Sequence, residues 1–239
     1  MIARAVAAGI AHILVPGYDL ASSRAAVALA ETHAGLIDAA VGIHPHHAAA
    51  ASVDTDTWPQ LAALARHPGV VAIGEIGLDY FRNLSPPDVQ RAAFARQLRL
   101  ATEVRKPVLV HDRDAHRDIS EALLGCANPS WHRPAGVLHA FSGDAPMATR
   151  LASAGFLVSF ALPVAFRSAV GPRAAAAALP EGSFLVETDA PWLAPGGGEA
   201  RNEPTTALRV AAELARLRGL SPEEVTRAVG EAYGRLVGG

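Results

Sequence analysis

Short apolar runs alternate along the chain with longer segments in which apolar residues recur every three or four positions. The apolar runs predict strands at 11–15, 36–43, 70–74, 107–110, 136–138, 155–160 and 183–188. The periodic segments predict helices at 1–9, 22–33, 57–66, 89–105, 115–124, 145–153, 167–179, 205–218 and 221–236. Strand and helix follow each other at the spacing of β-strand–helix units, which predicts an α/β fold, a TIM-type (β/α) barrel.

The pattern yields seven strands, whereas a closed barrel of this type has eight. The first predicted helix, at 1–9, has no strand before it. We therefore expect one barrel domain over residues 1–239 that is truncated at its N-terminus and holds seven of the eight strands.

Several helix ends carry recognisable signals. Ser221, Pro222 and Glu224 form the pattern of a capping box at the start of the last helix. Ser22 or Ser23 is expected to cap the helix at 22–33. The stretch 191–204 is rich in glycine and proline and predicts a loop.

The strand at 70–74 runs into a carboxylate, Glu75, that is flanked by Gly74 and Gly77. A buried parallel strand is apolar almost throughout, so an acid at its carboxyl end is unusual. Ligands and catalytic groups of α/β proteins gather at those ends, and glycine lets backbone or ligand approach closely. Glu75 is therefore a candidate functional residue; capping of the next helix or pairing with an arginine is the alternative.

Composition narrows the class of protein. Half of the 239 residues are hydrophobic and 18% are charged, which is ample material for one large core. The single cysteine, Cys126, excludes an internal disulfide and is expected to be a small buried apolar residue. The start of the chain lacks the features of a signal peptide, and no apolar run has the length of a membrane span. These features predict a cytoplasmic globular protein.

The formal net charge of -2 argues against a general duplex-binding surface, which needs clustered positive charge. It remains compatible with an enzyme that contacts only a few phosphate groups.

Side chains suited to metal binding follow four of the predicted strands: Glu75, His111, His139 and Asp189. A barrel brings its strand ends to one face, so these residues are expected to converge. Nitrogen and carboxylate ligands suit a divalent transition metal, and a carboxylate can bridge two ions. Each histidine alone is more simply explained as a core or loop residue; the recurrence at four strand ends favours a metal centre.

Six segments together resemble the signature blocks of the TatD family of metal-dependent deoxyribonucleases, which belongs to the amidohydrolase-like barrels. They are GIHPH at 42–46, GEIGLDY at 74–80, HDRDA at 111–115, HAFSG at 139–143, ETDAPWL at 187–193 and RNEP at 201–204. The blocks stand in the order and spacing of the family and span nearly the whole chain. The resemblance implies a divalent-metal-dependent hydrolase, a deoxyribonuclease or exonuclease acting on nucleic acid, with single-stranded DNA ends as the expected substrate and no obligate protein partner.

The resemblance also implies roles for individual residues. Glu75 would bridge two divalent ions (Mg, Mn or Zn), and His111 and His139 would complete one of them. Asp189 would hold the other ion and take a proton from the attacking water, so Asp189 and Glu75 are the expected catalytic residues. His44 is expected to contact the substrate phosphate.

Other residues of these blocks have two interpretations. Arg113, just after a predicted ligand, would clamp a phosphate, or it would pair with Asp112 or Asp114. Asp79 is interpreted as a support for the ligands, and His47 as a packing residue. The RNEP segment is interpreted as a turn that fixes the preceding loop.

Two departures from the family pattern stand out. The chain has no first strand bearing a His-x-His or related pair, which in the family holds the ion that Asp189 also binds. We therefore expect one intact metal site, one weak or empty site and little nuclease activity. Ala232 stands where an asparagine is usual, a small loss that is expected to affect helix docking only. The alternatives are a deacylase or amidohydrolase using the same metals, and an inactive truncated remnant.

Overall fold

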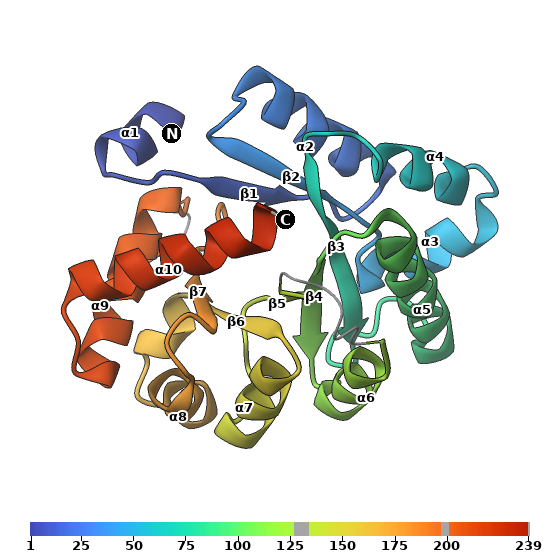
Figure 1. Cartoon of the computed structure of the whole chain (residues 1–239). Coiled ribbons are helices and arrows are strands. Elements are labelled where there is room, and N and C mark those ends of the chain that lie inside the picture. Colours follow the sequence, from blue (N-terminus) through green and yellow to red (C-terminus); the bar gives the residue numbers. More distant parts are fainter. Residues whose placement is uncertain (127–133, 197–200, 239) are drawn as a thin grey trace. The chain divides into compact units, whose positions relative to one another are not determined.

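The computed structural model describes residues 1–126, 134–196 and 201–238. The chain divides into two compact units, which we name after a candidate ligand in each. The Glu75 unit contains residues 12–126 and 135–137, and the Asp189 unit contains residues 1–11, 134, 138–196 and 201–238. Seven strands alternate with helices along the described residues, which confirms the predicted α/β class (Figure 1).

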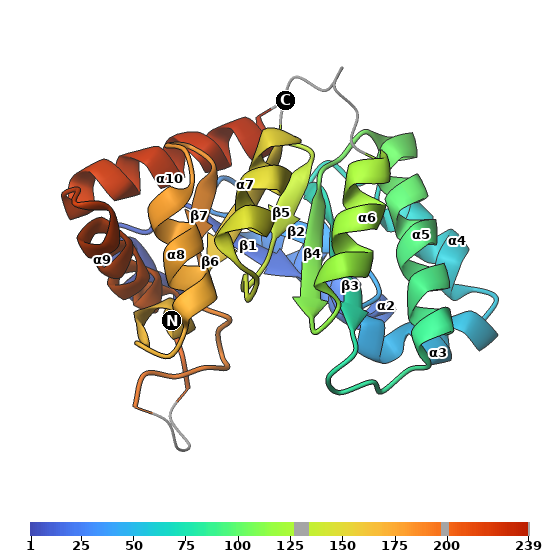
Figure 2. The same cartoon turned by 90° about the horizontal axis from the view of Figure 1, so that it is seen from below.

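The Glu75 unit is a parallel sheet with helices packed against it. Its strands are β1 (Ile13–Pro16), β2 (Ile37–Val41), β3 (Val70–Asp79) and β4 (Val108–Arg113), paired in the order of the sequence. Its helical segments are α2 (Leu20–Thr32), η1 (Pro45–His47), α3 (Ala48–Val53), α4 (Thr57–Leu64), α5 (Pro87–Val104) and α6 (His116–Cys126). Figure 2 shows α5 and α6 covering one side of β3 and β4.

The short strand β5 (Gly136–Leu138) is divided between the units by sequence, with Leu138 in the Asp189 unit. That unit also contains the parallel pair β6 (Phe156–Phe160) and β7 (Phe184–Val186). Its helical segments are α1 (Ile2–Ala7), α7 (Ala145–Ser153), η2 (Leu162–Ala165), α8 (Val170–Ala178), η3 (Pro204–Thr206), α9 (Ala207–Arg218) and α10 (Pro222–Val237). Helices α9 and α10 pack against each other and against β7 (Figure 1).

Close backbone packing around β3 explains its glycines. A Cβ atom on Gly77, whose φ is +142°, would lie 2.0 Å from the carbonyl oxygen of His111 on β4. A Cβ on Gly74 would lie 2.5 Å from the Cβ of Leu109. The glycines around Glu75 therefore let neighbouring strands approach, as the sequence indicated.

The predicted capping box of α10 is confirmed: the Ser221 hydroxyl accepts from the Glu224 amide, and the Glu224 carboxylate accepts from the Ser221 amide. The cap of α2 is Asp19, not Ser22 or Ser23 as the sequence suggested. The Asp19 carboxylate accepts from the Ser22 amide at 2.7 Å, which leaves Ser22 inside the first turn. A carboxylate satisfies the free amide as well as a hydroxyl does, so the sequence alone did not separate these candidates.

Some element lengths differ from the prediction. Strand β3 extends to Asp79, five residues beyond the predicted end at 74, because the glycines allow pairing with β4 to continue. The helix α3 was not predicted, since its alanine run carries no apolar periodicity.

Cys126 is exposed at the end of α6, so the expectation of a buried residue was wrong. Its thiol donates to the Leu123 carbonyl, and partial burial raises the pKa of Cys126. None of the helices in the described residues combines the length and apolar character that a membrane crossing requires.

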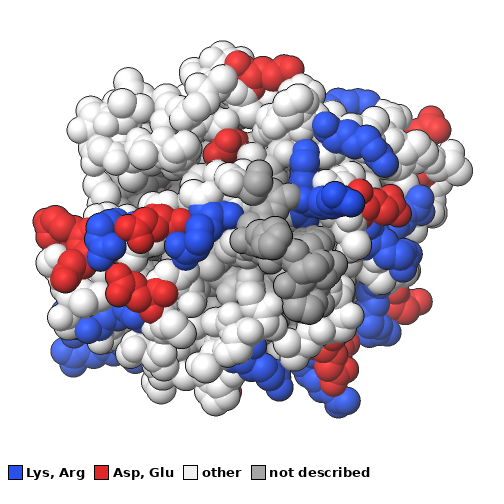
Figure 3. All heavy atoms as spheres, viewed as in Figure 1, with Lys and Arg blue, Asp and Glu red and all other residues white. Residues whose placement is uncertain are grey.

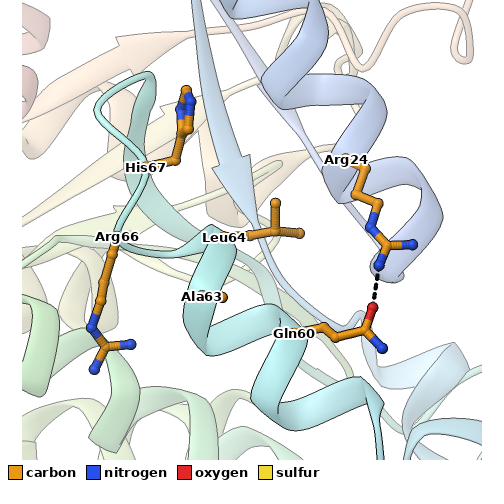
Figure 4. Close-up of a pocket in the computed structure, with 6 residues that line it drawn as sticks. All are labelled: Arg24, Gln60, Ala63, Leu64, Arg66 and His67. Atoms are coloured by element: carbon orange, nitrogen blue, oxygen red, sulfur yellow. Dashed lines mark hydrogen bonds between the residues drawn. The ribbon is translucent and has the colours of Figure 1, made fainter.

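One pocket of about 430 Å³ lies on the Glu75 unit, where α2 faces α4 and the turn that follows it (Figure 4). Arg24 donates to Gln60 across it, and His67 contacts Glu31 at 3.1 Å. No candidate metal ligand lines this pocket; its lining residues are Arg24, Gln60, Ala63, Leu64, Arg66 and His67. It is therefore separate from the site described next.

Candidate metal centre

Glu75 lies within β3, at a point where the register with β4 shifts between Ile73 and Ile76. Its amide donates to the Gly17 carbonyl at 2.8 Å, which fixes the backbone from the β1 side. Pairing with β4 resumes at Ile76, and Gly77 pairs with His111, whose Nδ1 lies 2.9 Å from the Glu75 carboxylate. Both ligands are therefore carried by strands and not by a loop.

Three potential ligand atoms gather at Glu75. Oε1 of Glu75 lies 2.9 Å from Nδ1 of His111 and 3.6 Å from Nε2 of His44. One ligand atom from each of the three residues lies within 4.8 Å of the others. Imidazole nitrogen and carboxylate oxygen at this spacing fit a divalent ion.

Asp79 lies behind these ligands and is buried, with 1% of its side chain exposed. Its Oδ2 accepts from Nε2 of His46 at 2.7 Å and lies 3.4 Å from Nε2 of His111, while Oδ1 accepts from the Arg82 amide at 2.7 Å. Burial alone would raise the pKa of Asp79, but the hydrogen bonds from His111, the Arg82 amide and His46 outweigh it and hold the pKa well below its usual range.

Both nitrogens of the His111 ring face a carboxylate: Nδ1 lies 2.9 Å from Oε1 of Glu75, and Nε2 lies 3.4 Å from Oδ2 of Asp79. A neutral imidazole carries one N–H, and a nitrogen that binds metal must be unprotonated. With a metal ion on Nδ1 the proton would be on Nε2, and Asp79 would accept it in a hydrogen bond.

In His44 the proton is on the nitrogen that faces Glu75. Its Nδ1 accepts a hydrogen bond from the His46 amide at 3.2 Å, so the proton of the neutral ring is on Nε2, the atom that faces Glu75. Burial lowers the pKa of His44 to about 3, so the ring is neutral near pH 7. A neutral ring with an N–H at this point is a hydrogen-bond donor, which suits the predicted phosphate contact better than a metal ligand.

The Asp189 unit holds a second set, formed by His139, Glu187 and Asp189. Nδ1 of His139 donates to Oε2 of Glu187 at 2.5 Å, and the Ala140 amide donates to Oε1. The lone pair of His139 is therefore on Nε2, which lies 3.5 Å from Oδ1 of Asp189. The arrangement is a carboxylate that orients a histidine toward a second carboxylate.

The loop that carries Asp189 is fixed by Asn202. The buried Asn202 amide donates to the Thr188 carbonyl at 2.6 Å and to the Leu193 carbonyl at 3.3 Å. Next to it, Arg4 of α1 makes an ion pair with Glu203 at 2.5 Å. Asn202 thus fixes this loop, as the sequence interpretation expected, but residues 201–203 do not form the expected turn; they lead directly into η3.

The predicted ligands thus come together in two pairs, one within each unit: Glu75 with His111, and His139 with Asp189. The convergence of all four remains a prediction. Arg113 makes no ion pair with Asp112 or Asp114 among the described residues; its guanidinium lies over the ring of Phe81. Asp112 instead accepts from the Ala115 amide and contacts His116.

Glu187 is the functional residue that the sequence interpretation missed. Its signal was available, because it stands two residues before Asp189 in the ETD segment, and alternate residues of an extended chain share a face.

Comparison with known proteins gives one consistent family. The family model described as TatD related DNase matches residues 1–238. The uncharacterized metal-dependent hydrolase YabD of Bacillus subtilis is 35% identical over 99% of this chain and 91% of its own length. The 3'-5' ssDNA/RNA exonuclease TatD of Enterobacter lignolyticus is 37% identical over 92% of this chain and 84% of its own length.

Among solved structures, the TatD homologue YJJV of Escherichia coli K12 superposes with a TM-score of 0.88 at 33% identity, covering 99% of this chain and 90% of that one. This match confirms the predicted fold, a TIM-type barrel architecture of which the described residues hold seven strands. The fold, the two histidine–carboxylate sets and these matches agree, and the chain belongs to the family of TatD-related metal-dependent hydrolases.

Proposed function

We propose that this chain hydrolyses phosphodiester bonds at the ends of single-stranded DNA or RNA with the help of divalent metal ions. The observation that carries the proposal is the pairing of a ligand histidine with a carboxylate in each unit, each histidine being oriented by a second carboxylate. The name of the Enterobacter relative, a 3'-5' ssDNA/RNA exonuclease, supplies the substrate class.

The residues that would hold metal are Glu75, His111, His139 and Asp189, with Glu75 shared between two ions. A bound divalent ion would lower the pKa of a water molecule and stabilise negative charge on the phosphate. The chain's own side chains supply the remaining functions: orientation, proton transfer and substrate contact.

Asp189 is the proposed general base. Its carboxylate is one-third exposed, at 34%, and the two neighbouring carboxylate oxygens of Glu187 are already engaged by His139 and Ala140. Asp189 therefore has access to an attacking water and takes its proton. Glu187 and Asp79 hold the histidine rings in the tautomers that expose a lone pair to metal.

His44 and Arg113 are the proposed phosphate contacts. Nε2–H of His44 points to the side of Glu75 where the scissile phosphate would bind. Arg113 is exposed, two residues beyond His111, and can donate from the edge of its guanidinium to a phosphate oxygen.

We also propose that the two ions bind with unequal affinity. One ion would be held by Glu75, His111 and His139. The other ion would share Glu75 and rely on Asp189, so it is expected to be the weaker. We further propose that both units form one hydrolase domain that works in the cytoplasm.

The test is hydrolysis of an end-labelled single strand by metal-stripped protein, titrated with Mg²⁺, Mn²⁺ or Zn²⁺. Metal-dependent release of nucleotides from one end, lost in Asp189→Asn, is the expected result. Cleavage of an ester or amide substrate without cleavage of DNA or RNA would replace this proposal with a deacylase or amidohydrolase. No hydrolysis of any substrate with both sites loaded would identify an inactive remnant.

A further inference from the structure

An aromatic side chain stands exposed beside the Glu75 site. Phe81, in the turn between β3 and α5, is 62% exposed, although aromatic rings normally contribute to cores. One face of its ring is covered by the guanidinium of Arg113, whose central carbon lies 4.2 Å from the ring centroid. The covered face and the large exposed fraction leave the opposite face open to solvent.

The backbone that carries Phe81 is fixed on both sides. The Tyr80 amide donates to the Arg113 carbonyl at 2.9 Å, and the Arg82 amide donates to Asp79 at 2.7 Å. The buried side chain of Gln90 then donates to the Ser85 carbonyl at 2.7 Å. The exposed ring is therefore held in place before any ligand arrives, and little order has to be gained on binding.

The register of the ladder places this ring next to the metal ligands. Asp79, the last residue of β3, pairs with Arg113, the last residue of β4, and Gly77 pairs with His111. Arg113 therefore lies two residues beyond His111 on β4, and Phe81, whose ring Arg113 covers, lies in the turn two residues after β3 ends. Two residues of strand correspond to about 7 Å. A group bound at Phe81 would thus be adjacent to a phosphate bound at His111.

Charge around the ring is positive but limited. Arg82 and Arg113 are both exposed, and neither makes an ion pair with a described residue. The face of the molecule drawn in Figure 3 carries acidic and basic side chains intermixed, without a continuous basic surface. Such a site suits a few nucleotides of a single strand better than a length of duplex.

We propose that the open face of Phe81 stacks an unpaired base of the nucleic acid, next to the phosphate that is cleaved. Arg113 covers the inner face of the ring and donates from its edge to the backbone of the same strand. A base inside a duplex has both faces already stacked, so this subsite accepts only single-stranded ends. The inference rests on the proposed function and adds the structural basis of its single-strand preference.

The test separates base stacking from phosphate contact. Binding of fluorescein-labelled deoxythymidine 10-mers is measured by anisotropy in EDTA, for the parent and for Phe81→Ala. The same pair is measured with a 10-mer of abasic sugar phosphates. Phe81→Ala should weaken binding of the normal strand by roughly 5- to 150-fold and leave binding of the abasic strand unchanged.

Matched variants control for folding and for hydrophobicity. Phe81→Leu keeps an apolar side chain without the ring and should behave as Phe81→Ala, while Phe81→Trp should bind as the parent does. Leu84→Ala removes a side chain of the same turn that is equally exposed, at 63%, and should change nothing.

Equal binding of the normal strand by parent and Phe81→Ala would overturn the inference, as would an equal loss on normal and abasic strands. Absence of measurable binding by the parent in EDTA would overturn it as well. Cleavage by the parent after addition of Mn²⁺ is scored separately, so failure of the proposed function is distinguished from failure of the stacking site.

Discussion

The Glu75 set (Glu75, His111 and the supporting Asp79) and the Asp189 set (Asp189, His139 and the supporting Glu187) share one arrangement of side chains on different backbone structures. In both, a second carboxylate contacts one nitrogen of the histidine ring: Asp79 contacts His111, and Glu187 contacts His139. In the Glu75 set the ligands stand on paired strands, and the supporting Asp79 is 1% exposed. In the Asp189 set, β7 ends at Val186, and the acids follow in irregular backbone.

This difference shows two ways of holding a ligand. Glu75 lies in β3 and His111 in β4, and the pairing of these strands on either side of a register shift at Glu75 positions both ligands, together with the bond from the Glu75 amide to the Gly17 carbonyl. Asp189 has a φ of +58°, an uncommon backbone conformation for a residue with a side chain. It is kept there by neighbouring bonds, including those of Asn202. The Asp189 set is therefore expected to depend more on single side chains.

The largest loss of turnover is expected from substitution of Asp189. Asp189→Asn removes the proton acceptor, because an amide cannot take up the water proton, and turnover should fall by roughly 10²–10⁴-fold. Steady-state rates on an end-labelled strand measure it, with circular dichroism as the control for folding. Turnover within a factor of a few of the parent would rule out the base role, and with it the functional asymmetry of the two sets.

The supporting carboxylates should affect the same ion, because Asp79 contacts His111 and Glu187 contacts His139, and both histidines are proposed ligands of the ion that binds more tightly. Asp79→Asn and Glu187→Gln should each lower the affinity for that ion by about 10- to 100-fold, because the histidine loses the partner that fixes its ring. Isothermal titration with Mn²⁺ should show the loss for both variants in the tighter binding event. If either variant binds both ions as the parent does, its carboxylate is not a support.

Substitution of His44 tests whether the Glu75 set has two metal ligands or three. His44→Ala should lower kcat/KM by roughly 10- to 100-fold, since a hydrogen bond to a charged phosphate is lost, and should leave metal content unchanged. His44→Gln keeps an N–H donor and should recover part of the rate. Loss of bound metal in both variants would make His44 a ligand and contradict the tautomer derived from the His46 amide.

A smaller effect is expected from the loop anchor. Asn202→Ala leaves the carbonyls of Thr188 and Leu193 without their buried donor and should lower the free energy of unfolding by about 1–3 kcal/mol. Urea unfolding measures the change. Ser221→Ala, which removes the helix cap of α10 in the same unit, is the matched control, because it should cost about 1 kcal/mol without affecting turnover.

The sequence predicted the features that follow from the local pattern of apolar and polar residues along the chain. It placed seven strands, the acid of β3, the histidine of β4 and the histidine that follows β5, because apolar runs and the polar residues beside them are local features. The capping box at Ser221 was predicted for the same reason.

The structural features that the sequence did not predict depend on backbone outside the strands and on contacts between strands. The stacking of Arg113 on Phe81 follows from the register of β3 against β4 and is not encoded in a local run of residues. The contact of Glu187 with His139 joins residues 48 positions apart, and the spacing of Glu187 and Asp189 was its only local signal. The exposure of Cys126 likewise reflects the point at which α6 ends.

The central claim is that Glu75, His111, His139 and Asp189 form one metal centre. Crystals of the chain soaked in Mn²⁺ test it directly through anomalous diffraction. The account predicts a strong manganese peak contacted by Glu75, His111 and His139, and a weaker peak nearby contacted by Glu75 and Asp189. Separate peaks at the two pairs without a shared Glu75, or no peak at any of the four side chains, would contradict it.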